Sequence, residues 1–328
     1  MAHPLRVSTV DILSQSSHPP LAIVLMGPTA SGKTRLAIDL AQACNGEIIS
    51  VDSALVYRGM DIGTAKPMLE ERDGVPHHLI DVLDPSEAYS TGQFHQDALA
   101  LMEAIARRGR VPILAGGTML YFNGLFHGLA KLPPANPAIR AEIDNEARQR
   151  GWDRLHADLA AIDPMAAARI HPNDPQRIQR ALEVYRITGI PLSALLAVAQ
   201  PSLRYRLCKL VLAPAGREAL HARIRTRFQD MIERGLIDEV RGLRERGDLH
   251  AGLPAIRAVG YRQVWAYLEG QYGRDELVER GVIATRQFAK RQLTWLRRET
   301  DAARYETEDP RLMDKILRDL SRLIEGPA

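Results

Sequence analysis

Residues 27–34 constrain this chain more than any other stretch, because their spacing is G-x-x-x-x-G-K-[ST]. An apolar run, Leu21 to Met26, precedes them, and a helix-forming stretch, Arg35 to Ala43, follows. A strand, a glycine-rich turn and a helix in this order are typical of a phosphate-binding loop. The residues expected to bind a diphosphate are Gly27, Pro28, Thr29, Ala30, Ser31, Gly32, Lys33 and Thr34.

Each part of this phosphate loop has a physical task. Gly27 and Gly32 let the backbone fold closely around an anion, so that N–H groups and the helix N-terminus point at it. Lys33 adds a mobile positive charge, and the Thr34 hydroxyl is a ligand for Mg²⁺, the one cofactor that we expect. A chance match in a surface turn is the alternative, and the flanking strand and helix argue against it. We therefore predict a diphosphate-containing ligand.

Apolar runs alternate with helical stretches along the first part of the chain. Besides residues 21–26, strands are predicted at residues 47–51, 78–82, 111–115 and 207–212, with only helices after the last of these. Such alternation predicts the α/β fold class, here a P-loop NTPase-like parallel sheet flanked by helices.

Two cap patterns mark helix starts within this alternation. Ser90 and Gln93 form a capping box before a helix that continues to Arg108, and Thr118 is placed to cap a helix over 119–126. Ligands of parallel sheets bind at the carboxyl ends of the strands. We therefore expect Asp52, Thr118 and the phosphate loop to share one cleft.

The pattern changes after residue 133, and only helical signals follow until about residue 201. Three proline-led helix starts are predicted there, each with a capping residue first: Asn136-Pro137, Asp163-Pro164 and Asp174-Pro175. The predicted organisation is a disordered leader over 1–20, an α/β core over 21–133 and 204–328 that includes C-terminal helices, and an all-helical insertion domain over 134–203.

Composition limits the remaining choices. The net charge is only +3 over 328 residues, so nucleic-acid binding would depend on local clusters of charge. Cys44 and Cys208 show no C-x-x-C spacing, which argues against a zinc site or disulfide framework and favours the cytoplasm. No apolar run approaches the ~18 residues of a membrane span. We expect a cytoplasmic monomer without a membrane partner.

Cations occur at helical spacing in the C-terminal part. Arg223 and Arg227 are four residues apart beside an apolar stripe, where a solvated rim is an equal alternative. Residues 286–298 contain no acidic residue and include Arg286, Lys290, Arg291, Arg297 and Arg298, with Phe288 and Trp295 between them. This pattern fits a helix lying along a phosphate backbone, and equally a solvated amphipathic helix.

Several longer motifs resemble the tRNA dimethylallyltransferases, or tRNA isopentenyltransferases, of the IPP transferase family. In chain order they are residues 27–34, 52–55, Tyr57 with 60–67, 116–121, 171–177, 259–263, and 285–287 with 290–295. The resemblance extends from Leu21 to Arg298 and fits the bacterial form, which has no appended zinc finger. It implies transfer of a dimethylallyl group from dimethylallyl diphosphate to N6 of the adenosine 3′ of a tRNA anticodon, position 37, with release of pyrophosphate.

The resemblance also assigns roles, and the chemistry agrees with them. The adenine amine must lose a proton, and Asp52 is the expected acceptor, with a magnesium-water ligand or a helix cap as its alternatives. Thr118 is expected near the bridging oxygen of the donor. Lys33 and an arginine would stabilise the leaving group, with Arg223 as first choice and Arg227 as second.

Contacts with tRNA are likewise implied by the resemblance, which favours RNA binding for the basic helix. The expected residues are Asp52, Ser53, Ala54, Leu55, Thr118, Arg140, Gln176, Arg177, Ile178, Gln179, Arg180, Arg257, Ala258, Val259, Gly260, Tyr261, Arg262, Lys290, Arg291, Gln292, Leu293, Thr294, Trp295, Leu296 and Arg297. His77, His78 and His171 have no Cys/His partner at metal spacing and are expected to be structural.

Two other functions are compatible with parts of the sequence. A kinase of a small metabolite or nucleoside shares the phosphate loop, although no cluster of arginines for a γ-phosphate is evident. A non-catalytic RNA-binding module would use the basic helix but leaves Asp52 and the Gly116-Gly117-Thr118 motif unexplained.

Overall fold

The computed structural model describes residues 19–198 and 203–325, and it divides into two compact units. The core unit combines residues 1–124 with 204–328, and the insertion unit comprises residues 125–203. The division therefore lies nine residues before the predicted start of the insertion at residue 134. The predicted leader falls largely on residues 1–18, outside the described residues.

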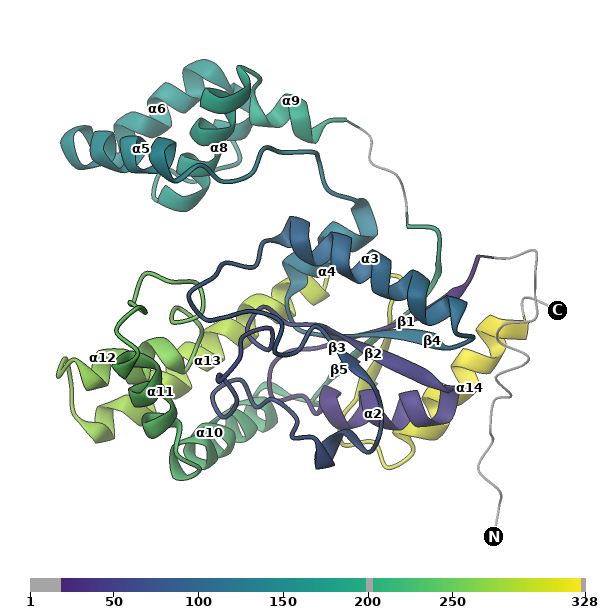
Figure 1. The fold of residues 1–328 in the computed structure, drawn as a ribbon. Helices are drawn as coiled ribbons and strands as arrows, with labels where there is room; N and C mark the ends of the chain where they lie inside the picture. The colour runs from purple at the N-terminus through teal and green to yellow at the C-terminus, as the bar shows by residue number, and fades with distance from the viewer. Residues whose placement is uncertain (1–18, 199–202, 326–328) are drawn as a thin grey trace, which may run out of the picture. The chain divides into compact units, whose positions relative to one another are not determined.

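A parallel sheet forms the centre of the core unit (Figure 1). Its order is β3-β2-β4-β1-β5-β6, and every neighbouring pair is parallel. The strands are β1 (Leu21–Met26), β2 (Gly46–Val51), β3 (His77–His78), β4 (Val111–Gly116), β5 (Arg206–Ala213) and β6 (Ala303–Glu306). This confirms the predicted α/β class.

Two details of the strand prediction were wrong. The strand expected over 78–82 is only His77–His78, because Leu79 and Asp81 have positive φ angles of 60° and 57°, which no strand accommodates. The chain after β5 is not purely helical, since β6 adds an edge strand. The β6 segment is mostly exposed and shows no apolar run, so its sequence gave no strand signal.

Helices cover both faces of the sheet and extend beyond one end of it (Figure 1). The helices that begin in the core unit are α2 (Lys33–Cys44), α3 (Thr91–Arg107), α4 (Met119–His127), α10 (Arg217–Glu233), α11 (Leu236–Glu245), α12 (Tyr261–Leu268), α13 (Arg274–Leu296) and α14 (Leu312–Glu325), with a 3₁₀ turn at Glu70–Arg72. The capping box of α3 is confirmed, because Ser90 Oγ accepts from Gln93 N at 3.1 Å and Gln93 Oε1 accepts from Ser90 N at 2.9 Å.

Two hydrophobic clusters among the described residues show how helices pack in the core unit. In the first, α2 and α14 pack on one face of the sheet, and α14 contributes Ile316, Leu317 and Leu320. Both cysteines are free thiols buried in this cluster. In the second, helices α10 to α13 pack on one another and on the segment after β2, through Val56 and Met60. The C-terminal helices thus have a core of their own.

The insertion unit is a bundle with a separate core. Its helices are α5 (Pro137–Arg150), α6 (Trp152–Ile162), α7 (Pro164–Ala167), α8 (Pro175–Thr188) and α9 (Leu192–Leu196). All three predicted caps are confirmed, since the side chains of Asn136, Asp163 and Asp174 accept from N–H groups of the following helix. Among the described helices of both units, none combines the length and apolar content needed to cross a membrane.

Candidate active site

A cavity of about 660 Å³ opens in the core unit where β1, β2 and β4 end. One wall consists of the chain segments that follow these strands, Thr29 to Thr34, Asp52 to Leu55 and Gly116-Gly117. The other wall consists of the loop at 63–67, of Arg257 in the segment before α12, and of residues on α10 and α13, among them Ile224, Arg227, Phe228, Phe288 and Arg291. Of the three groups predicted to share a cleft at the strand ends, the phosphate loop and Asp52 line this cavity, and Thr118 does not.

The phosphate loop has the backbone geometry that an anion requires. Gly32 adopts φ 82°, a left-handed conformation that favours glycine, and α2 begins at the next residue. A Cβ on Gly27 would lie 2.3 Å from the backbone oxygen of Leu212, so only glycine fits there. No side chain among the described residues caps α2 at Gly32, which leaves its first N–H groups available to an anion.

Lys33 lies over this loop, partly buried. Its Nζ donates to the backbone oxygen of Pro28 at 2.6 Å and contacts Ser31 Oγ at 3.4 Å. Burial, together with the positive charge of Arg227, lowers the pKa of Lys33 to about 7, and the negative charge of Asp52 opposes this shift only in part. The cation that would bind a diphosphate is therefore close to losing its proton in the free protein.

Asp52 and Thr118 are fixed at the ends of two neighbouring strands. Asp52 Oδ1 accepts from Ala54 N at 2.8 Å, a local turn that sets the direction of the carboxylate. Thr118 Oγ1 accepts from Ser53 N at 3.0 Å, and Thr118 N donates to Val51 O at 3.1 Å. The Thr118 side chain, which we expected to cap α4, thus ties α4 to the end of β2. It adjoins lining residues without being one of them.

The structure separates the two arginines of α10. Arg227 lines the cavity, where its Nη2 lies 3.5 Å from Thr64 O and burial lowers its pKa. Arg223 is not among the lining residues, and its Nε lies 3.7 Å from Glu308 Oε1. The geometry therefore favours Arg227, the second choice from sequence, as the arginine nearest a bound anion.

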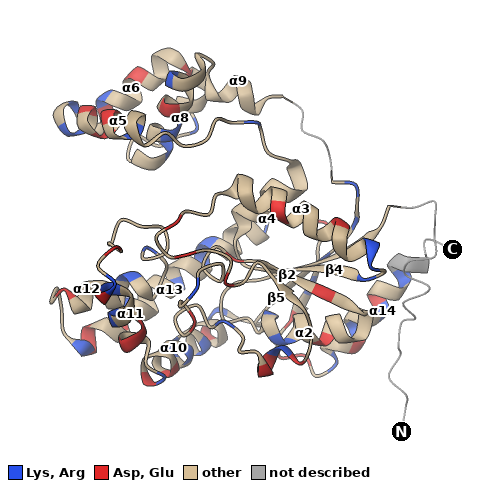
Figure 2. Ribbon diagram, in the orientation of Figure 1, with Lys and Arg blue, Asp and Glu red and all other residues tan. Residues whose placement is uncertain are grey.

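Two exposed arginines add positive charge to the helical wall. Arg257 precedes α12 and Arg291 lies on α13, and both line the cavity. The guanidinium carbon of Arg291 lies 5.9 Å from the ring centre of Phe288, which lines the same wall. On α10, on α11 and in the first half of α13, Lys and Arg occur together with Asp and Glu (Figure 2), whereas residues 286–298 contain no acidic residue. The excess of positive charge on these helices is therefore greatest in the second half of α13, which carries Arg291.

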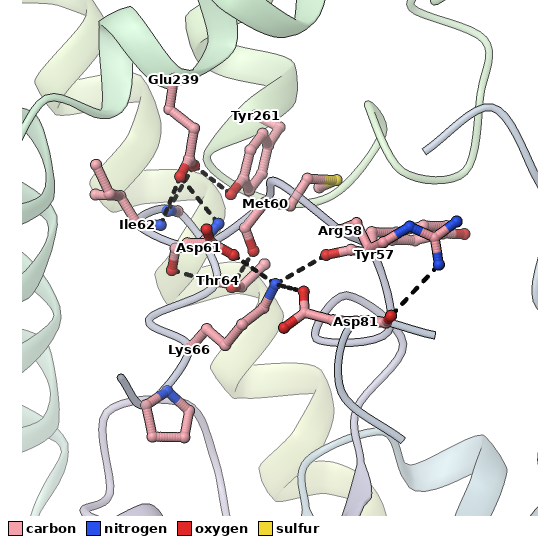
Figure 3. Close-up of polar contacts among 12 residues, drawn as sticks. Tyr57, Arg58, Met60, Asp61, Ile62, Thr64, Lys66, Asp81, Glu239 and Tyr261 are labelled. Carbon is pink, nitrogen blue, oxygen red and sulfur yellow. Dashed lines mark hydrogen bonds and ion pairs between the residues drawn. The ribbon is translucent and has the colours of Figure 1, made fainter. Parts of the chain in front are cut away.

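Glu239 of α11 organises the loop that forms part of the helical wall (Figure 3). Its Oε2 accepts from Asp61 N at 2.9 Å and Ile62 N at 2.8 Å, while its Oε1 accepts from Gly63 N at 3.2 Å. Tyr261 Oη donates to the same Oε1 at 2.5 Å. One carboxylate thus holds this loop to the start of α12.

Lys66 anchors the other end of the same loop (Figure 3). Its ammonium group donates to Asp61 Oδ1 and Asp81 Oδ1, each at 2.5 Å, and to Tyr57 O at 2.8 Å. Its side chain is only 5% exposed, so these partners compensate a buried charge. We infer that this lysine supports the wall and does not bind the ligand.

The residues expected to contact tRNA fall into three groups. Those that line the cavity are Asp52, Ser53, Ala54, Leu55, Arg257, Ala258, Val259, Gly260, Arg291 and Gln292. The exposed ones elsewhere in the core unit are Arg262, Lys290, Thr294 and Arg297, whereas Tyr261 and Leu296 are buried and Leu293 and Trp295 are partly buried. Arg297 lies just after α13 ends at Leu296.

Within the insertion unit, several expected tRNA contacts have structural partners. Glu183 is fully buried and binds Arg140 at 2.8 Å and Arg180 at 2.6 Å. Ile178 belongs to the hydrophobic core and Gln179 donates to Asp144 at 2.6 Å. Gln176 and Arg177, in the first turn of α8, are exposed.

The histidines singled out from the sequence form hydrogen bonds with neighbouring residues and do not form a metal site in the described part of the chain. His78 Nε2 lies 2.7 Å from Glu47 Oε2, His77 Nδ1 lies 2.8 Å from Val75 O, and His171 Nδ1 accepts from Asn173 N. No group of three or more His, Cys, Asp or Glu side chains in the described chain could hold a metal ion. A metal at this cavity would need oxygen atoms of its ligand.

Sequence reasoning missed two residues that hold the phosphate loop. Thr307, after β6, donates through Oγ1 to Ser31 O at 3.0 Å. Gln292 of α13 accepts from Thr29 N at 2.9 Å, although the sequence placed it among the RNA contacts. Both are more than 260 residues away from their partners in the chain, so no local spacing could have indicated these contacts.

Comparisons with known proteins identify the family of this chain. The family model described as IPP transferase matches residues 55–299. A tRNA dimethylallyltransferase of Methylococcus capsulatus is 60% identical over 94% of this chain and 99% of its own length. One from Nitrosococcus oceani is 58% identical over 92% of this chain and 96% of its own length.

Two solved structures extend the comparison to three dimensions. The full-length tRNA isopentenylpyrophosphate transferase from Bacillus halodurans has a TM-score of 0.69 and 39% identity, covering 93% of this chain and 97% of its own. A eukaryotic dimethylallyltransferase acting on tRNA has a TM-score of 0.77 and 31% identity, covering 92% of this chain and 77% of its own. This chain therefore belongs to the IPP transferase family and is a transferase.

Proposed function

We propose that this enzyme transfers a dimethylallyl group from dimethylallyl diphosphate to N6 of the adenosine 3′ of the anticodon, position 37, in tRNA. The products are N6-isopentenyladenosine and pyrophosphate. The observation that carries the proposal is the meeting, in one cavity, of the phosphate loop, Asp52 and the arginines of the helical wall. Membership of the IPP transferase family supports it.

The reaction joins the adenine nitrogen to the allylic carbon of the donor while the bond from that carbon to the diphosphate oxygen breaks. Negative charge grows on the departing pyrophosphate, and the N–H groups of the phosphate loop, Lys33 and Arg227 are placed to stabilise it. Thr118, whose Oγ1 accepts from Ser53 N just after β2, is proposed to act near the bridging oxygen of the donor. Arg223, the first choice from the sequence, becomes the second candidate for this arginine.

The amine must also lose a proton, and Asp52 is the proposed acceptor. Its carboxylate lines the cavity on the same wall as the phosphate loop, and Oδ1 is held by Ala54 N. A base that is fixed by a backbone hydrogen bond meets the proton in one orientation. An adenosine in the anticodon loop would have to leave its stack to reach this carboxylate.

Mg²⁺ is the proposed cofactor, and the available donors fit it. Thr34 and Asp52 offer oxygen atoms at the cavity, which suits a hard cation whose remaining ligands are phosphate oxygens and water. When bound, the ion would neutralise part of the diphosphate charge. Because no protein cage is involved, EDTA should abolish transfer and leave the melting temperature nearly unchanged. A large loss of stability with EDTA would instead indicate a structural metal.

For tRNA, we propose that the exposed cations beside the cavity bind the phosphate backbone. Lys290, Arg291 and Arg297 are all exposed on or just after α13, and Arg257 lines the cavity together with Arg291. We further propose that the enzyme acts as a monomer in the cytoplasm, a compartment that suits its two free thiols.

The kinase alternative gains no support from the comparisons, whose reported members are all isopentenyl- or dimethylallyltransferases. The decisive experiment incubates the protein with tRNA, dimethylallyl diphosphate and Mg²⁺, digests the tRNA and weighs its nucleosides. We expect a prenylated adenosine from position 37. Unmodified tRNA, under conditions in which the protein binds both substrates, would refute the proposed function.

A further inference from the structure

Gln292 is the side chain of α13 that turns away from solvent and towards the phosphate loop. It is only 4% exposed, whereas its neighbours Lys290 and Arg291 are exposed. Its Oε1 accepts from Thr29 N at 2.9 Å, and its Nε2 donates to Gly117 O at 2.8 Å. Both partners line the cavity, and they follow β1 and β4 respectively.

The two hydrogen bonds fix the orientation of the amide group. A side-chain amide has one acceptor oxygen and an NH₂ group that only donates. Reversing it would set the NH₂ group against the N–H of Thr29 and the oxygen against the carbonyl of Gly117. The phosphate loop therefore binds the amide oxygen of Gln292, and the turn after β4 binds its NH₂ group. A side chain with only a donor or only an acceptor cannot form both hydrogen bonds.

The surrounding backbone leaves room for this amide and for little else. A Cβ on Gly117 would lie 2.4 Å from Gln292 Nε2 and 3.3 Å from the backbone oxygen of Gly27. The absence of a side chain at Gly117 thus lets β4, the phosphate loop and α13 approach one another. This close approach explains why the second position of the Gly116-Gly117-Thr118 motif is a glycine.

We propose that Gln292 is a positioning residue, which holds the phosphate loop and the turn after β4 in the geometry that binds a diphosphate. It is not itself a contact to RNA. Because Thr29 N is already bonded to Gln292, the N–H groups left for the anion are those from Ala30 to Thr34. Since α13 also carries Lys290 and Arg291, Gln292 connects the proposed RNA-binding helix to the donor site.

The proposal rests on the proposed function only in the identity of the donor, so its test uses inorganic pyrophosphate with Mg²⁺ as the probe. Gln292→Met retains the length of the side chain and removes both hydrogen bonds. Gln287→Met is the matched control, because Gln287 is an exposed glutamine on the same helix. Melting curves verify that both variants are folded.

For Gln292→Met we expect the Kd for pyrophosphate to rise about tenfold or more, as for loss of two buried hydrogen bonds. The Kd for tRNA should stay within about twofold, and Gln287→Met should change neither value. Unchanged pyrophosphate affinity in Gln292→Met would overturn the proposal, and loss of tRNA affinity alone would make Gln292 an RNA contact. Failure of wild-type protein to prenylate tRNA would refute the proposed function and leave this binding test valid.

A second variant, Gln292→Glu, keeps the test decisive if the methionine variant does not fold. Its ionised carboxylate would repel Gly117 O, whereas the protonated acid donates to it as the amide does. The ratio of the variant's Kd for pyrophosphate to that of wild type should therefore fall from pH 8 to pH 5.5. Lys33, Arg227 and Asp52 are present in both proteins, so their effects on the Kd largely cancel in this ratio. An equal ratio at both pH values would contradict the donation to Gly117.

Discussion

The two walls of the cavity offer positive charge to an anion by different physical means. On the phosphate-loop wall, backbone N–H groups converge because Gly32 takes a left-handed conformation and α2 begins immediately after it. On the helical wall, the charge comes from long side chains, Arg227, Arg257 and Arg291, which reach the cavity from α10, from the segment before α12 and from α13. The N–H donors of the first wall belong to adjacent residues of the phosphate loop, whereas the cations of the second wall are distant from one another in the chain.

This difference explains which wall the sequence could predict. The backbone wall follows from eight consecutive residues, so its spacing alone indicated the site. The helical wall depends on how α10 and α13 pack against each other. At their contact, a Cβ on Gly281 of α13 would lie only 2.0 Å from Cζ of Phe228 on α10, so the ring fits there because residue 281 is a glycine. Periodicity places arginines on a helix face but does not say which face meets the cavity.

The largest expected effect lies on the phosphate-loop wall, at Asp52. Asp52→Asn retains an oxygen to accept from Ala54 N, so the turn should persist while the proton acceptor is lost. We expect the single-turnover rate of transfer to fall by roughly 10²–10⁴-fold, the usual range for a general base. Binding of tRNA should change little. A rate close to that of wild type would remove Asp52 from this role.

The helical wall is tested by exchanging its arginine for a neutral side chain. Arg227→Gln should lower the single-turnover rate by about 10²-fold, since it removes a cation aimed at the leaving group. Arg223→Gln is the matched control one turn away on α10, and its effect should be much smaller because Arg223 lies beside Glu308. If Arg223→Gln proves the more damaging, the sequence-based first choice is right and the helical wall must rearrange around its substrates.

A third prediction concerns the positive charge of Lys33 on the phosphate-loop wall. With its pKa lowered to about 7, Lys33 is largely neutral at pH 8 in the free protein. A diphosphate raises this pKa, because an adjacent anion favours the charged form, so binding should take up close to one proton at pH 8 and much less at pH 6.

Calorimetry of Mg²⁺-pyrophosphate binding in buffers of different ionisation enthalpy measures this uptake, after subtraction of the ligand's own protonation in free solution. An uptake that is zero at pH 8, or that grows as the pH falls, would show that Lys33 is already charged before the ligand arrives.

The smallest effect is expected for single cations on the outer side of α13. Lys290 and Arg297 are both exposed, and each phosphate contact should contribute about one unit to the log–log salt dependence of tRNA binding. Lys290→Ala and Arg297→Ala should each lower that slope by about one, with no change in donor affinity. Arg107→Ala on α3 is the control, an exposed arginine paired with Glu103. An unchanged slope in both variants would make this surface a solvated face.

The part of the fold that the sequence predicted is the part that short-range rules govern. Buried apolar strands, the capping box at Ser90 and the three Asx-Pro helix starts depend on neighbouring residues only. The edge strand β6 pairs with β5 through an exposed segment, so the evidence for it lies in its partner and not in its own residues.

The same division applies to the candidate site. The phosphate loop and Asp52 were predicted with their neighbours, whereas the inward direction of Gln292 and the contact of Thr307 with Ser31 needed the folded chain. Glu239 is a further case. Nothing in the sequence around it indicates that its carboxylate accepts from the successive N–H groups of residues 61–63, about 177 residues earlier in the chain.

We propose that this phosphate loop holds a prenyl diphosphate and not a nucleoside triphosphate. One experiment separates the two ligands: the enzyme receives dimethylallyl diphosphate, ATP, Mg²⁺ and tRNA together, and both pyrophosphate release and ATP concentration are followed. We expect pyrophosphate release that requires both tRNA and dimethylallyl diphosphate while ATP stays intact. ATP consumption linked to turnover, or pyrophosphate release without tRNA at the same rate, would contradict it.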